Sequence, residues 1–304
     1  MARYAVIDVG TNSVKFHIGE KRADGTWTKI VDRAEVTRLG EGLEASGGEF
    51  TPDAMERTVA AIEGMVEEAR CHAVAGVAVV GTMGMRTARN SDTFIAEVER
   101  RCGVRIEVIP GTEEGRLAYL AVKSGLGLAA GSMVIFDTGG GSTQFTFGRG
   151  AAVTEQFSLN VGAVRFTERY GLAGVVAPAD LQRAMDAMAA DLTRLDGAAV
   201  PDVLVGMGGA VTNLTAVMLG LATYDPDVVQ GARLTRAEIE RQIEFYRSRS
   251  TEARRQIVGL QPKRADVILA GACIVRTVLL KLRTEELSVS DRGLRHGLLV
   301  DRFG

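Results

Sequence analysis

Two loops with the same arrangement of residue types are the most distinctive feature of this 304-residue chain. Residues 7–19 read IDVGTNSVKFHIG and residues 136–148 read FDTGGGSTQFTFG, so that five positions are identical at a constant offset. Each copy is predicted to form an apolar strand that ends in Asp, a turn of small residues and a second, alternating strand. Both segments therefore predict a β-hairpin whose turn exposes backbone N–H groups and hydroxyls beside one carboxylate.

These residue types suit a phosphate ligand. Small residues allow the backbone to approach a phosphate closely, and Ser and Thr hydroxyls add hydrogen-bond donors. Asp8 and Asp137 end the first strands, where a carboxylate could hold Mg²⁺ directly or through water. A single such hairpin is more often an ordinary glycine-rich turn. Because both copies retain the Asp, we favour a pair of hairpins that clamps a phosphate chain from two sides.

Glu113 and Glu114 are the first candidates for acid–base chemistry. They follow Pro110-Gly111-Thr112, and with Thr112 as N-cap both would lie in the first turn of a helix, where the helix dipole lowers carboxyl pKa values. An ionised carboxylate near a bound phosphate could deprotonate an attacking water. Residue types alone favour the simpler interpretation, because acidic residues are common at helix starts.

A glycine loop and three arginines are further candidates for anion binding. Gly208 and Gly209 follow an apolar strand and open a helix, a geometry that binds phosphate or simply packs a helix tightly onto a sheet. Arg86, Arg165 and Arg264 lie near the glycine loops, and guanidinium groups bind phosphate in a bidentate manner. Most arginines are only solvated surface residues, so none of the three is a specific signal alone.

Strands and helices alternate along the chain, which predicts an α/β protein with mixed sheets covered by helices. Strands are expected at 4–9, 14–20, 75–80, 104–109, 133–137, 143–148, 202–206 and 286–290. Helices are expected near 52–70, 91–102, 113–124, 179–195, 235–248, 264–283 and 293–303. We divide the chain into domains 1–124 and 125–304, with the last helix able to pack back on the first domain.

Composition narrows the class of protein. The 36 Lys and Arg against 38 Asp and Glu give a net charge of −2, which excludes a protein that coats nucleic acid. No run approaches the roughly 18 apolar residues of a membrane span, and the N-terminus does not resemble a signal peptide. The three cysteines lie far apart without metal-ligand spacing. These features are typical of a protein of the reducing cytoplasm.

The ordered set of motifs resembles the exopolyphosphatase/guanosine pentaphosphate phosphohydrolase (Ppx/GppA) family, nearly from end to end. The segments that carry the resemblance are DVGTNSVK at 8–15, RLGEGL at 38–43, GTMGMR at 81–86 with Asn90, GTEEGR at 111–116, DTGGGSTQ at 137–144, GAVR at 162–165, GGAVTNL at 208–214, RAD at 264–266 and SDRGLR at 290–295. The resemblance implies two ribonuclease-H-like domains of the actin-like ATPase type with a cleft between them.

The resemblance also implies a reaction, namely hydrolysis of a terminal phosphoanhydride of inorganic polyphosphate or guanosine pentaphosphate with Mg²⁺ or Mn²⁺. The family's catalytic base falls on Glu114, which reverses the interpretation from residue types alone. Asp137 and Asp8 would be metal ligands, and Arg86 would hold a phosphate. The other residues expected to bind substrate are Thr11, Asn12, Ser13, Lys15, Gly139, Gly140, Gly141, Ser142, Arg165, Gly208, Gly209 and Arg264.

Three residues depart from the family pattern. Gln144 replaces a usual Glu, which removes a charge and a candidate metal ligand, Ala210 replaces Thr, and His296 replaces Glu. Longer relatives carry extra C-terminal domains associated with long polymers, so short polyphosphate is the expected substrate. A non-catalytic polyphosphate or nucleotide sensor and an ATP-dependent kinase are the alternatives from other classes. A homodimer is expected from the family and from base rates.

Overall fold

The computed structural model describes residues 1–11, 13–41, 43, 46–126, 131–150 and 152–304. These residues form two compact units: unit 1 consists of Met1–Ala121 with Gly293–Gly304, and unit 2 consists of Val122–Arg292. The two units divide after Ala121, and the last helix, which was expected to be able to pack back on the first domain, is counted with unit 1.

Unit 1 is built on a five-stranded mixed sheet in the order β3-β2-β1-β4-β5. Strand β1 pairs antiparallel with β2 and parallel with β4. The elements are β1 (Ala2–Val9), β2 (Ser13–Lys21), β3 (Trp27–Val36), α1 (Pro52–Cys71), β4 (Gly76–Gly81), α2 (Met83–Thr87), α3 (Ser91–Cys102), β5 (Ile106–Val108), α4 (Gly111–Leu126) and α12 (Leu294–Phe303).

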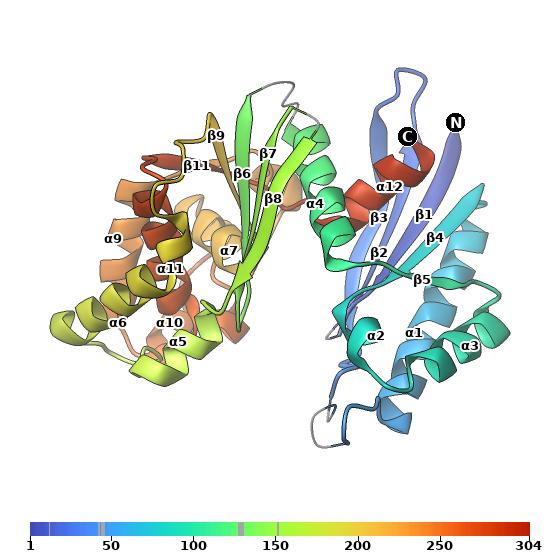
Figure 1. The fold of residues 1–304 in the computed structure, drawn as a ribbon, viewed down its shortest axis with the longest axis horizontal. Helices are drawn as coiled ribbons and strands as arrows, with labels where there is room; N and C mark the ends of the chain where they lie inside the picture. The colour runs from blue at the N-terminus through green and yellow to red at the C-terminus, as the bar shows by residue number, and fades with distance from the viewer. Residues whose placement is uncertain (12, 42, 44–45, 127–130, 151) are drawn as a thin grey trace. The chain divides into compact units, whose positions relative to one another are not determined.

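Helices cover both faces of the unit 1 sheet (Figure 1), and the alternating side chains of β1 enter two separate core layers. Ala5, Ile7 and Val9 pack in the layer formed with α1 and α3. Val6 packs in the opposite layer, formed with α4 and α12. Because neighbouring strand residues point to opposite faces, Asp8 shares the face of Val6. The sheet therefore directs Asp8 toward the layer that contains α4.

Unit 2 repeats the central strand pairing of unit 1 in a six-stranded sheet ordered β10-β11-β9-β6-β7-β8. As in unit 1, the first strand pairs antiparallel with the second and parallel with a later one. The elements are β6 (Ser132–Thr138), β7 (Thr143–Arg149), β8 (Ala152–Leu159), α5 (Ala163–Tyr170), α6 (Pro178–Asp191), η1 (Thr193–Leu195), β9 (Val203–Met207), α7 (Gly208–Met218), α8 (Pro226–Val229), β10 (Arg233–Thr235), α9 (Arg236–Arg247), α10 (Thr251–Arg255), η2 (Pro262–Arg264), α11 (Ile268–Lys281) and β11 (Glu286–Val289).

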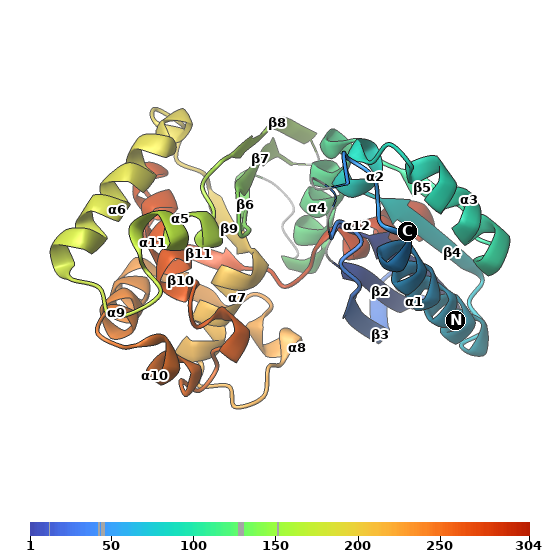
Figure 2. The ribbon, with the colours of Figure 1, turned by 90° about the horizontal axis from the view of Figure 1, so that it is seen from below.

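Helix α11 is the centre of the helical layer in unit 2. It is apolar on nearly all sides, as expected of a helix buried within a protein core. It packs against α5, α6, α7 and α9, which surround it in Figure 2. Since α11 begins shortly after η2, the packing of this buried helix also fixes the loop that carries Arg264.

The predicted mixed α/β architecture is confirmed, and the ends of every predicted strand lie within two residues of those of an observed strand. Strands β3, β8 and β10 were not predicted, because each lies at a sheet edge and is partly exposed, without clear apolar alternation. Within the described residues, no helix is both long and apolar enough to cross a membrane.

Candidate active site

The two hairpins predicted from the repeat have the same local geometry. The Gly10 N–H donates to the Ser13 carbonyl at 3.1 Å, and the Gly139 N–H donates to the Ser142 carbonyl at 2.9 Å. In the strand register, Asp8 lies opposite Lys15 and Asp137 lies opposite Gln144. The predicted phosphate-binding residue Asn12 lies outside the described residues.

Two glycines hold Thr11 of the first hairpin in place. The Gly40 N–H donates to the Thr11 carbonyl at 2.8 Å. A Cβ atom at Gly40 would overlap the Thr11 methyl group, and one at Gly84 would lie 2.9 Å from the Thr11 hydroxyl. The loop after β3 and the start of α2 therefore both close on the first phosphate loop, and only glycine allows this approach.

Asp8 is a buried carboxylate with one cation beside it. Its side chain lies within unit 1 and the residue is only 3% exposed. The Lys15 ammonium donates to Asp8 Oδ2 at 3.3 Å from the facing strand. A buried carboxylate requires such a partner because burial penalises its charge. Lys15 thus supplies part of the positive charge at this end of β1.

Arg86 connects the short helix α2 to the start of α4. Its Nη1 donates to Glu114 Oε1 and, at 2.5 Å, to the Ile109 carbonyl. Both side chains are about 30% exposed. Glu113 instead pairs with Arg116, which also donates to Asp301 of α12 at 2.7 Å. The two adjacent glutamates therefore differ: Glu114 faces Arg86 and the phosphate loop, whereas Glu113 belongs to a structural ion network.

The pKa values of these glutamates move in opposite directions. Burial raises the pKa of Glu114, with a smaller increase from Asp8, and Arg86 and Lys15 oppose it. Hydrogen bonds from Arg116 lower the pKa of Glu113. The expectation that the helix start lowers both values is therefore wrong for Glu114, because desolvation outweighs the favourable charges there. Helix α4 begins at Gly111, so that Thr112 lies inside the helix rather than at its N-cap.

In unit 2 the second hairpin rests on the start of α5. The Ala163 N–H donates to the Gly139 carbonyl, and the N–H groups of Val164 and Arg165 donate to the Gly140 carbonyl, at 2.9–3.1 Å. A side chain at Gly162 would overlap the hairpin backbone. The helix start is therefore used to support the phosphate loop, and the exposed Arg165 side chain projects from it.

Asp137, the glycine loop and Arg264 form one constellation. Gly208 has φ +82°, and a Cβ atom there would overlap Asp137 Oδ1. A Cβ atom at Gly209 would overlap the Arg264 guanidinium, which therefore lies directly on the backbone of this loop. Burial lowers the pKa of Arg264, and Asp137 opposes that shift. The structure thus brings together the predicted residues Asp137, Gly208, Gly209 and Arg264.

Asn213 belongs to the GGAVTNL segment, for which the sequence predicted no role at this position. Its Nδ2 donates to the Gly209 carbonyl at 2.9 Å, and its Oδ1 accepts from the Gln261 N–H at 2.8 Å. It therefore joins the glycine loop to the turn that carries Arg264. A small hollow of about 40 Å³ lies between Arg264, Gly139, Gly140 and the apolar side chains of Ala210 and Val164.

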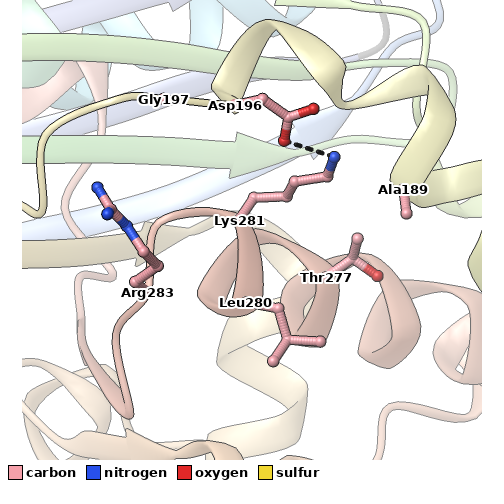
Figure 3. Close-up of a pocket in the computed structure, with 7 residues that line it drawn as sticks. All are labelled: Ala189, Asp196, Gly197, Thr277, Leu280, Lys281 and Arg283. Atoms are coloured by element: carbon pink, nitrogen blue, oxygen red, sulfur yellow. Dashed lines mark hydrogen bonds and ion pairs between the residues drawn. The ribbon is translucent and has the colours of Figure 1, made fainter.

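Another hollow of unit 2, whose lining residues are drawn in Figure 3, lies at the strand ends opposite those that carry the phosphate loops. It has a volume of about 370 Å³ and is lined in part by Asp196, Lys281 and Arg283. Lys281 pairs with Asp196 at 2.6 Å, and Arg283 donates to the Ala198 carbonyl at 2.6 Å. These residues precede β9 and β11, whereas the phosphate loops follow β6 and β9. The cationic side chains of this hollow already bind other groups of the protein, so we do not consider it the phosphate-binding site.

The donor set at the second hairpin fits Mg²⁺. Gln144 Nε2 donates to Ser142 Oγ at 2.8 Å, which leaves its amide oxygen to bind a cation across the strand pair from Asp137. Mg²⁺ is commonly held by one or two carboxylates together with water and substrate phosphates. Asp137 with the Gln144 oxygen meets that requirement within unit 2.

Among the residues that the structure describes, one cluster has the composition of a transition-metal site: His17, Asp32 and His296. His296 Nδ1 accepts the Gly293 N–H at 3.1 Å, so a neutral ring carries its hydrogen on Nε2, which lies 3.2 Å from Asp32 Oδ2. Arg295 donates to both Asp32 oxygens. The contacts of Asp32 with Arg295 and His296 therefore anchor α12 to β3, whereas the buried His17 Nδ1, 3.7 Å from Asp32 Oδ1, has no hydrogen-bond partner among the described residues.

Comparisons with known proteins point to one family. The Ppx/GppA phosphatase family model matches residues 18–304. "Exopolyphosphatase 2" of Mycobacterium tuberculosis is 30% identical over 100% of this chain and 99% of its own length. A guanosine-5'-triphosphate,3'-diphosphate pyrophosphatase of Photobacterium profundum is 28% identical over 98% of this chain and 59% of that protein. The crystal structure of the Aquifex aeolicus Ppx/GppA phosphatase superposes with a TM-score of 0.92 at 32% identity, covering both chains fully.

The fold, the paired hairpins and the Glu113-Glu114 helix start thus occur together in a chain that matches this family along nearly its whole length. Such an ordered match is more specific than any one motif. This protein belongs to the Ppx/GppA phosphatase family.

Proposed function

We propose that this protein is a metal-dependent exopolyphosphatase that releases the terminal phosphate of inorganic polyphosphate, with short chains as its preferred substrates. The observation that carries this proposal is Glu114, a half-buried carboxylate with a raised pKa that is oriented by Arg86 beside the first phosphate loop. The names of the relatives add support, because they include exopolyphosphatases and one guanosine pentaphosphate-type phosphatase.

Glu114 would act as the general base. A carboxylate whose pKa is raised toward neutrality accepts a proton more readily than an ordinary glutamate does. The oxygen of water attacks the terminal phosphorus, the bond from phosphorus to the bridging oxygen breaks, and the proton of the water passes to Glu114. The products are inorganic phosphate and a chain that is one phosphate shorter.

Positioning and neutralisation of charge would supply most of the rate enhancement, as is usual for phosphoryl transfer. In unit 1, the remaining donors of Arg86 and the Thr11–Ser13 loop would hold phosphate oxygens, with Lys15 nearby. In unit 2, Gly139–Ser142, Gly208, Gly209 and Arg264 would bind phosphate, with Arg165 at the edge. Mg²⁺ or Mn²⁺ would neutralise charge on the phosphate oxygens, and Asp137 in unit 2 and Asp8 in unit 1 are the candidate carboxylate ligands.

Location and assembly are also part of this proposal. Cys71, Cys102 and Cys273 are all free thiols, as is usual in the reducing cytoplasm. A homodimer is the default for a protein of this kind, and light scattering of the purified protein would measure its mass.

Phosphate release from short polyphosphate, long polyphosphate and guanosine pentaphosphate, each with Mg²⁺ and with Mn²⁺, tests the proposal. We expect the fastest release from short polyphosphate. Faster release from guanosine pentaphosphate would assign the chain to the nucleotide substrate instead. Tight binding without release from any substrate would identify a binding protein rather than an enzyme.

A further inference from the structure

Arg38 has an unusual backbone conformation next to the first phosphate loop. Its φ angle is +51°, and Ala73 and Arg283 are the other non-glycine residues with positive φ in the described parts of the chain. The left-handed conformation brings Cβ close to the following carbonyl and costs free energy for any residue other than glycine. Glycine would avoid this cost, so the arginine side chain itself calls for an explanation.

The strand topology places Arg38 at the same end of the strands as the catalytic candidates of unit 1. Strands β1 and β4 end at Val9 and Gly81, which pair with each other, and β3 ends at Val36, opposite Ser13 of the hairpin. The loops that follow these three strands therefore emerge at the same end of the sheet. The Gly40 N–H fastens the loop of Arg38 directly to the Thr11 carbonyl.

Buried neighbours fix the position of Arg38 and leave its side chain outside. Thr37 is 4% exposed and Leu39 is fully buried, whereas Arg38 is exposed. The Glu41 N–H closes a turn on the Arg38 carbonyl at 2.9 Å. The loop thus presents a guanidinium to solvent from a rigid base.

Arg38 also lacks the partner that its neighbours have. Arg57 pairs with Glu41 at 2.7 Å, and Arg33 pairs with Glu68 at 2.9 Å. The Arg38 guanidinium makes no hydrogen bond or ion pair with any residue in the portion of the chain that the structure describes. The one carboxylate in its own turn, Glu41, is therefore already engaged by another arginine. A free guanidinium beside a phosphate loop suits a phosphate oxygen.

We propose that Arg38 is a substrate-binding residue that holds an inner phosphate of a polyphosphate chain whose terminal phosphate lies at the first hairpin. This inference rests on the function proposed above. Strands β1 and β3 are two strand spacings apart, which is about 10 Å. Only a substrate of several linked phosphates reaches from the end of β1 to Arg38. The residue would therefore strengthen the binding of every chain longer than tripolyphosphate, including the short chains of the proposed function, without setting the rate of release.

The test compares Arg38→Gln with Arg105→Gln. Arg105 is also an exposed arginine of unit 1, but it directly precedes β5 and therefore lies at the opposite end of the strands. Phosphate release is measured with tripolyphosphate and with long polyphosphate, and binding of long polyphosphate is measured by calorimetry. For Arg38→Gln we expect KM and Kd for long polyphosphate to rise about tenfold, the value of one charge-assisted hydrogen bond, with a smaller rise for tripolyphosphate and little change in kcat. Arg105→Gln should match the wild type.

Arg38→Gly separates binding from structure. Glycine relieves the backbone strain, so this variant should unfold at a higher temperature than the wild type while it shows the same loss of affinity as Arg38→Gln. Equal affinities for the Arg38 and Arg105 variants would overturn the role of Arg38 and leave the proposed function intact. Binding that depends on Arg38, without any release of phosphate, would support the binding role and overturn the proposed hydrolysis. A protein that does not bind polyphosphate would overturn both.

Discussion

Replacing Gly208 with alanine should damage the unit 2 phosphate site without unfolding the protein. The new Cβ atom would lie 3.2 Å from the carboxyl carbon of Asp137 and from the Thr138 carbonyl oxygen, and would overlap Asp137 Oδ1. These separations are shorter than the contact distance between carbon atoms, so the Asp137 carboxylate must move. The left-handed φ of +82° adds strain for alanine.

The magnitude follows from two contributions. An alanine in the left-handed region costs about 1–2 kcal/mol, and overpacking against Asp137 costs about 1–3 kcal/mol more. Gly220→Ala is the matched control, because Gly220 has φ +63° and its new Cβ atom would have no neighbouring atom within 4 Å. Urea unfolding should therefore show a loss of about 2–5 kcal/mol for Gly208→Ala and only the strain contribution for Gly220→Ala.

Function should separate the two variants further. Because Asp137 is the carboxylate proposed to hold Mg²⁺, the Mg²⁺ concentration for half-maximal phosphate release should rise about tenfold in Gly208→Ala and stay unchanged in Gly220→Ala. Phosphate release at graded Mg²⁺ measures this directly. Identical metal titrations for the two variants would refute the argument that Gly208 sets the position of a metal-binding carboxylate.

Three other substitutions test separate parts of the account. Gln144→Glu should lower the Mg²⁺ requirement for phosphate release, because it adds a carboxylate opposite Asp137; an unchanged titration would mean that the extra charge is compensated elsewhere. Arg86→Gln should move the acid limb of the kcat/KM profile to higher pH, because Arg86 lowers the pKa of Glu114 while burial raises it, and an unmoved limb would argue against Glu114 as the titrating base. His296→Gln should flatten the loss of stability on acidification. Burial lowers the pKa of His296 from 6.5 to about 4, so the unfolded chain binds the proton first and the wild type loses up to about 3 kcal/mol as the pH falls through that window. Urea unfolding at graded pH measures this loss, and equal slopes for both proteins would contradict the assignment.

The hairpins were predictable because their determinants are local. Gly10 and Gly139 allow the same turn, and the following strands alternate, so the two sequences specify the same structure without help from distant residues. The edge strands β3 and β8 lack such a signal, since half-exposed strands carry mixed side chains. Their position depends on pairing with neighbours that a single segment does not reveal.

The electrostatics of the site depended on tertiary packing. Glu113 and Glu114 are adjacent and identical in type, yet one is paired with Arg116 and the other is desolvated beside Arg86. Which of them faces the phosphate loop follows from the packing of α4 on the sheet, and only the family resemblance selected Glu114 in advance. The contact of Arg264 with Gly209 likewise depends on two segments far apart in the chain.

Comparing Glu114→Gln with Glu113→Gln tests the central claim most directly. The two positions are neighbours in one helical turn, so the substitutions differ only in which carboxylate is lost. The account predicts that Glu114→Gln lowers kcat for short polyphosphate by about 10²–10⁴-fold while calorimetry still detects binding, and that Glu113→Gln retains most of the turnover. Retained turnover in Glu114→Gln would contradict its assignment as the base.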